Sequence, residues 1–287
     1  MIIDYILAAV ALIWLVVASV SDIKRREVAN WLSFSLLAIA LGLRAIGAIT
    51  MKQPPYFLYS ILIFAIFYAI SELFYQTKIF AGGDAKLLVA LSVVFATQPS
   101  FSEPFRILSL EFPFIAVLFY NILFVGSLFG IAYSIVLAIT NRKKFIREFS
   151  KLEKTNRKKI CLFEVIMLIL IFLFFITGIV SILILYVLGF IYPFLYIFVK
   201  AIENACMIKL VFPKELTEGD WLVNAVKIGR KIIKPTADGL SMSEIRMIRK
   251  ANKKVLIKQG IPFVPVFLIA VIVSLLNVLG FIVSLII

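Results

Sequence analysis

Two aspartates stand where acid–base chemistry is possible, each at one end of a long apolar segment. Asp22 follows the apolar run 3–20, and Asp84 opens the run 84–98 directly after two glycines. Dehydrating a carboxylate at a membrane boundary is unfavourable, so one is kept there mainly for function or for capping a helix. Two carboxylates that share a proton can activate a water molecule, which is the chemistry of aspartic proteases. This pair is therefore the first candidate for a reactive site.

The composition indicates a membrane protein in which carboxylates must carry any catalysis. The chain has 287 residues, 63% of them hydrophobic, and a mean hydropathy of +1.07. It contains no histidine, which excludes Ser-His-Asp and Cys-His catalysis and any metal site that uses imidazole. Cys161 and Cys206 are far apart in sequence and form no metal-binding spacing. We therefore expect no metal and no cofactor.

The apolar runs predict about eight transmembrane helices, because each is close to the roughly 20 residues that cross a bilayer. The run 161–199 is too long for one span and is interpreted as two spans joined by a tight turn, with Gly178, Gly189 and Pro193 as possible breaks. We predict an all-α polytopic membrane protein with a small cytoplasmic α+β subdomain. The expected spans are about 3–20, 30–49, 56–75, 84–98, 113–139, two within 161–199, and 261–287.

This reading divides the chain into five parts. They are an N-terminal transmembrane bundle with the aspartate pair (1–139), a basic cytoplasmic loop (140–160), a transmembrane hairpin (161–199), the cytoplasmic subdomain (200–259) and the last transmembrane helix (260–287).

The distribution of positive charge predicts which side of the membrane each part faces. With eight spans, all but three of the 30 Lys and Arg residues fall on one side; the exceptions are Arg44, Lys52 and Arg106. The positive-inside rule makes the charged side cytoplasmic. Both termini are then outside the cell membrane, and both aspartates lie near its cytoplasmic face. The net charge of +14 indicates contact with anionic lipid headgroups and no nucleic-acid partner.

The polar segment 200–259 contains three local patterns. Thr217 and Asp220 resemble an N-cap and its partner three residues on, and Ser241 with Glu244 predicts a capping box that opens a helix at about 242–252. Weak alternation over 227–235 predicts a short hairpin.

Each aspartate alone has an ordinary structural explanation. Asp84 after Gly82 and Gly83 is a common way to begin a helix, and Asp22 beside Lys24 is consistent with a surface ion pair. The predicted topology makes a structural explanation of both aspartates less favoured. It places the two carboxylates at one depth on the same side of the membrane, on different helices. Gly82 and Gly83 also leave room for another backbone or a substrate strand to approach Asp84.

These motifs resemble those of the membrane aspartyl proteases whose hallmark is Gly-x-Gly-Asp with a second aspartate at a membrane boundary. The family includes the type IV prepilin peptidases, the preflagellin peptidases and the presenilins. Here Ala81 stands in place of the first glycine. Three further segments resemble the archaeal prepilin peptidases in particular: residues 21–31, residues 216–221, and 260–265 at the start of the last span.

The resemblance implies that Asp22 and Asp84 are the catalytic pair. Residues expected to shape the site or contact substrate are Gly82, Gly83, Lys86, Pro262 and Pro265. Lys86 is equally explained by contact with headgroups, and the two prolines by an ordinary helix start.

The implied substrates are prepilin-like or preflagellin-like precursors, which carry a short basic leader before an apolar helix. No methyltransferase activity is expected, since the cysteines of the bacterial relatives are absent. A proton- or cation-coupled transporter that uses the same acids is the main alternative, and a non-catalytic assembly platform is the second.

Overall fold

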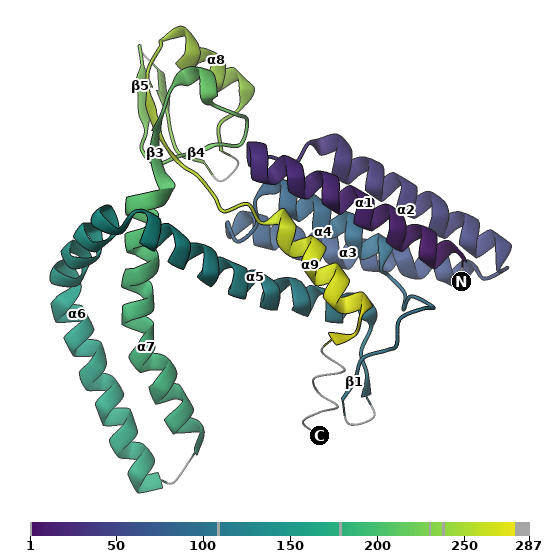
Figure 1. Cartoon of the computed structure of the whole chain (residues 1–287), viewed down its shortest axis with the longest axis horizontal. Helices are drawn as coiled ribbons and strands as arrows, with labels where there is room; N and C mark the ends of the chain where they lie inside the picture. Colours follow the sequence, from purple (N-terminus) through teal and green to yellow (C-terminus); the bar gives the residue numbers. More distant parts are fainter. Residues whose placement is uncertain (1, 108–109, 178–179, 230, 237–238, 279–287) are drawn as a thin grey trace. The chain divides into compact units, whose positions relative to one another are not determined.

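The computed structural model describes residues 2–107, 110–177, 180–229, 231–236 and 239–278 (Figure 1). The chain folds as two compact units. The first contains residues 1–130 and 260–287, and the second contains residues 131–259.

The first unit is a helical bundle that brings the two ends of the sequence together. Its elements are α1 (Ile2–Arg25), α2 (Asn30–Thr50), α3 (Pro54–Gln76), α4 (Gly82–Val94), the first part of α5 (Phe114–Thr140) and α9 (Val264–Leu275). α1 packs against α2, α4 and α9, and α4 also packs against α2 and α3. One apolar core therefore involves both the first and the last helix of the described chain.

The helix α4 is short and lies inside this bundle. It has 13 residues and is therefore about 20 Å long, less than the roughly 30 Å of a bilayer's hydrocarbon core. Every residue from Leu87 to Val94 is buried, as expected for a helix that is apolar on all sides. The helix occupies the place of the expected span 84–98, but it is shorter than a full crossing.

Five helices in the described part of the chain are long and apolar enough to cross a membrane: Ile2–Arg25, Asn30–Thr50, Pro54–Gln76, Phe114–Thr140 and Gly189–Met207. α9 is a shorter apolar helix of 12 residues, and the rest of its expected span, 279–287, lies outside the described residues. A helix thus lies at each of the eight expected places, and within the described residues five of them reach full length and apolarity. The chain is a polytopic membrane protein with a small sheet-containing region.

A buried arginine joins α2 to the end of α4. The Arg44 side chain is 1% exposed. It donates hydrogen bonds to the carbonyls of Val93 (3.2 Å) and Val94 (2.6 Å) and to the hydroxyls of Tyr56 and Thr97. The last carbonyls of a helix have no partner within it. Arg44 therefore satisfies the C-terminus of α4 inside the bundle.

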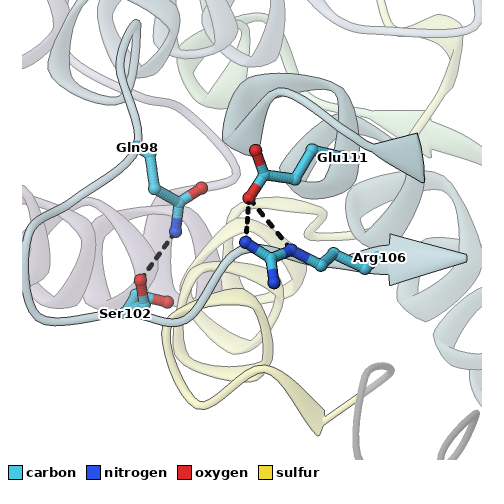
Figure 2. Close-up of polar contacts among 4 residues, drawn as sticks. All are labelled: Gln98, Ser102, Arg106 and Glu111. Carbon is cyan, nitrogen blue, oxygen red and sulfur yellow. Dashed lines mark hydrogen bonds and ion pairs between the residues drawn. The ribbon is translucent and has the colours of Figure 1, made fainter. Parts of the chain in front are cut away.

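The segment between α4 and α5 is held by local polar contacts (Figure 2). The Gln98 side-chain amide donates to the carbonyl of Ser102 at 2.8 Å. Beyond it, β1 (Arg106–Ile107) pairs with β2 (Leu110–Glu111), and Arg106 donates to Glu111 Oε1 from Nε and Nη2, at 3.0 and 2.6 Å. Both side chains are more than half exposed, so this ion pair contributes at most about 1 kcal/mol.

The second unit begins with two long helices that pack against each other, α6 (Arg142–Thr177) and α7 (Val180–Ile202). They confirm two helices across 161–199. The turn expected near Gly178 lies outside the described residues, and Pro193 lies within α7.

The prediction of a loop at 140–160 is wrong, because these residues are helical from Arg142 onward. The Phe145 ring packs edge-on against Phe198 of α7, with ring centroids 5.5 Å apart. Apolar side chains at helical spacing thus anchor a segment whose charge alone suggested a loop.

A small α+β region follows α7 and a π-helical turn, Glu203–Met207. Its elements are β3 (Ile208–Val211), a 3₁₀ helix (Pro213–Glu215), β4 (Trp221–Leu222), β5 (Val226–Ile228), β6 (Lys231–Ile233), α8 (Met242–Lys250) and β7 (Val255–Lys258). β7 lies between β3 and β4, and both pairings are antiparallel. Nine buried apolar residues give the region its own core.

Two of the three local predictions for this region are confirmed. β5 and β6 form the expected hairpin. Ser241 caps α8: its hydroxyl accepts from the Glu244 amide at 3.4 Å, and its own amide donates to the Glu244 carboxylate at 2.9 Å. The expectation of a helix cap at Thr217 is wrong. The Asp220 carboxylate accepts from the Thr217 amide at 2.8 Å, but this closes a turn that leads into β4.

Replacing Arg44 by methionine should lower the free energy of unfolding by about 2–4 kcal/mol, because it leaves buried carbonyls and hydroxyls without a donor. Arg106→Met is the matched control, and its exposed ion pair predicts a loss below about 1 kcal/mol. Denaturant titration of the full chain in detergent measures both. Equal losses in the two variants would contradict the role given to Arg44.

Candidate active site

Asp22 lies in the last turn of α1 and points into the protein. Its side chain is 7% exposed, and Oδ2 accepts a hydrogen bond from the backbone amide of Val264 at 2.9 Å. Val264 is the first residue of α9, where backbone amides have no partner within the helix and the helix dipole is positive. Asp22 therefore caps α9 across 242 positions of sequence.

A second contact holds the same two segments together. Arg26, one turn beyond Asp22, donates from Nη1 to the carbonyl of Gly260. The end of α1 thus binds the segment before α9 at two points, through a carboxylate that accepts and a guanidinium that donates. These contacts fix the position of Asp22 relative to the start of α9.

Asp84 is the third residue of α4 and is also buried, with 8% exposure. Its Oδ2 accepts from the backbone amide of Ala81 at 3.3 Å, so it caps its own helix from within the first turn. Ala81 has φ −72° and ψ 161°, an extended conformation open to any residue. The backbone therefore does not require the glycine that stands at this position in the resembled family.

The structure brings the two aspartates into one neighbourhood. α1 packs against α4, and the two carboxyl groups are close enough to interact electrostatically. Their hydrogen-bonding environments differ. Asp22 has a short bond from the N-terminus of another helix, whereas Asp84 has a longer bond from its own.

The two glycines before Asp84 are not equivalent. A Cβ atom on Gly83 would lie 3.0 Å from Val28 Cβ, whereas one on Gly82 would meet only a ring carbon of Tyr75, at 3.5 Å. Val28 belongs to the short connection between α1 and α2. Gly83 thus allows the start of α4 to pack against the connection that follows Asp22. The room expected for a substrate strand is, at Gly83, filled by the protein itself.

The remaining predicted site residues are placed as follows. Lys86 Nζ donates to Asn30 Oδ1 at 2.7 Å and lies 5.7 Å from the centre of the Phe34 ring, so it contacts α2. Pro262 is buried in the segment before α9, and Pro265 lies in its first turn. The ordinary reading of these prolines as a helix start is thus supported, and they flank the amide that binds Asp22.

Asp220 lies in the second unit. Burial raises the pKa of its carboxyl group, and the hydrogen bond from the Thr217 amide opposes this rise. Its bond to Thr217 gives it a structural role in the turn before β4.

Sequence reasoning missed the partners of the aspartates. Val264 acts through a backbone amide, which every residue except proline has, so its side chain carries no signal. Arg26 was counted only as a cytoplasmic charge. No group of three or more acidic or cysteine side chains suited to a metal occurs among the described residues.

Comparison with known proteins agrees with the resemblance read from the motifs. Residues 9–135 match the model of the type IV leader peptidase family. Prepilin peptidase EppA of Methanothermobacter thermautotrophicus is 27% identical over 154 residues, which cover 52% of this chain and 40% of that protein. The chain thus aligns with less than half of this relative's length. No solved structure matches.

The matched segment contains both aspartates, Gly82, Gly83 and Lys86, while α9 and the prolines lie outside it. The chain is therefore similar to an archaeal prepilin peptidase, and its residues 9–135 resemble the type IV leader peptidase family.

Proposed function

We propose that this protein is a membrane aspartyl endopeptidase that removes the short basic leader of prepilin-like or preflagellin-like precursors. The observation that carries the proposal is the pair of buried carboxylates at neighbouring ends of α1 and α4, inside the segment that matches the leader peptidases. The alternative of a transporter has no comparable support.

We assign different roles to the two acids. Asp22 holds the negative charge, because the Val264 amide at the N-terminus of α9 stabilises an ionised carboxylate and Arg26 lies one turn away. Asp84 holds the shared proton, because it is buried beside a charged neighbour and the bond that it accepts from Ala81 is the longer one, at 3.3 Å.

In this mechanism Asp22 takes a proton from a water molecule, and the resulting hydroxide attacks the scissile carbonyl carbon. Asp84 donates its proton to the carbonyl oxygen as the tetrahedral intermediate forms. Asp22 then protonates the leaving nitrogen as the C–N bond breaks, and the intermediate's hydroxyl proton returns to Asp84. The two carboxyl groups supply all the proton transfers, so the step needs no metal or cofactor.

The expected substrate follows from the topology predicted from charge. An apolar helix in the bilayer presents its leader at the cytoplasmic face, the depth expected for both aspartates. The cytoplasmic side of this protein is itself basic, so attraction does not draw a basic leader to it. Recognition therefore depends on the apolar helix and on small residues at the cleavage point.

Asp22→Asn and Asp84→Asn should each lower the cleavage rate by about 10²–10⁴-fold, because asparagine keeps the shape and the acceptor but transfers no proton. The assay uses the full chain in detergent with a precursor that has a basic leader and an apolar helix. Asp4→Asn, at the other end of α1, is the matched control and should leave the rate unchanged. Mass spectrometry should show a product with an unmethylated N-terminus even when a methyl donor is added.

Full activity in either of the first two variants, with the precursor cut at the same bond, would overturn the two-aspartate mechanism.

The roles of the acids predict where the shared proton resides. Infrared difference spectra between neutral and alkaline pH, a range in which exposed carboxyl groups stay ionised, should contain the C=O stretching band of a carboxyl group that is protonated at neutral pH. The band should disappear in Asp84→Asn and persist in Asp22→Asn, because Asp84 carries the proton. The opposite pattern would contradict the assignment while leaving the peptidase proposal intact.

Gly83→Ala should lower the cleavage rate and destabilise the protein by about 1–3 kcal/mol, because the added methyl group overlaps Val28 and displaces Asp84. Gly82→Ala is the control, since its added carbon meets only ordinary contact distances. Cleavage kinetics and denaturant titration of both variants measure the difference. Equal behaviour of the two alanines would show that Gly83 does not position Asp84.

A further inference from the structure

The three-stranded sheet β3-β7-β4 has one face that its own core does not cover. Its inner face carries Val211, Leu222, Val255 and Ile257, which belong to or pack against the core of the region. Side chains alternate between faces along a strand, so the outer face carries the other set. In the observed register its members are Ile208, Leu210, Leu256, Lys258 and Trp221.

The outer face is apolar and flanked by lysine. Leu210 is 60% exposed, and Phe212, which continues the same alternation, is 52% exposed. Lys254 Nζ lies 4.0 Å from the centre of the Phe212 ring, and Lys258 lies on the same face of the sheet. Exposed apolar side chains beside cations are typical of surfaces that contact a membrane.

The connection to α7 brings this face close to the bilayer. The candidate span Gly189–Met207 ends immediately before Ile208. A strand rises about 3.3 Å per residue, so Leu210 and Phe212 lie within roughly 17 Å of the end of that span.

Two contacts fasten the sheet to the π-helical turn Glu203–Met207, which follows α7. The Gln259 amide donates to the Met207 carbonyl at 2.9 Å, and Lys258 forms an ion pair with Glu203 at 3.2 Å. Trp221 pairs with Lys258 at the same end of the sheet, and tryptophan and lysine are enriched where proteins meet the headgroup region. The sheet is therefore fixed to the helix end rather than joined by a flexible linker.

We propose that the outer face of this sheet, defined by Leu210, Phe212 and Lys254, docks on the headgroup layer of an anionic bilayer. Leu210 and Phe212 insert among the upper acyl carbons, and Lys254 binds the lipid phosphate. The occupant is anionic lipid because the flanking charges are positive, which disfavours a basic peptide or a second copy of the same lysine-rich face. The proposal is independent of the peptidase function.

The test places a nitroxide on the full chain in nanodiscs. Cys161 and Cys206 are first replaced by serine, and Leu210→Cys then carries the label. Met242→Cys is the matched control: Met242 is 50% exposed at the start of α8, whose residues Ile245 and Ile248 belong to the core on the inner side of the sheet. Continuous-wave electron paramagnetic resonance compares collisions with oxygen, which concentrates in lipid, and with a water-soluble nickel complex.

In discs that contain phosphatidylglycerol, the ratio of oxygen to nickel collisions at position 210 should rise several-fold over that at position 242. The rise should shrink in pure phosphatidylcholine, at high salt and in the Lys254→Glu background, because each removes charge attraction. A label at 210 that stays as accessible to nickel as the control would overturn the proposal. Protection from both probes, the same in the two lipids, would also overturn it, since protein would then cover the face.

Discussion

The hydrogen bond between the Asp22 carboxylate and the Val264 amide is the contact on which the candidate site depends. A buried carboxylate needs donors, and the first amides of a buried helix need acceptors. Each of these groups is unfavourable alone in an apolar bundle, and together they satisfy each other. The arrangement fixes the helix that carries one aspartate against the helix that ends the described chain.

The second aspartate is held by a different constraint, the burial of α4. Arg44 satisfies the far end of this helix and Asp84 its near end, so both ends of a largely buried helix are capped inside the protein. Gly83 allows the near end to touch the connection after α1. Asp84 is thus positioned by backbone packing as much as by its own hydrogen bond.

The sequence predicted the locations of the helices well, because apolar runs and charged boundaries mark them directly. It did not distinguish a crossing helix from a buried one at 84–98, since both are equally apolar. The basic segment 140–160 was misread because Phe145, which packs on Phe198 of α7, was outweighed by the charge around it. The cap at Thr217 failed for a related reason, since the same hydrogen bond closes a turn as readily as it opens a helix. The Val264 amide gave no signal, because its role depends on a residue more than 200 positions away.

The continuous helix α6 changes what its positive charge can do. Its 36 residues span about 54 Å, nearly twice the thickness of the hydrocarbon core. Its basic half lies beside α7, because Phe145 packs on Phe198 and Phe163 packs on Tyr192, and both partners belong to the candidate span Gly189–Met207. If that span crosses the bilayer, the charges from Arg142 to Lys159 lie next to an apolar helix, and their long side chains must extend along the helix to bring ammonium and guanidinium groups to the headgroups.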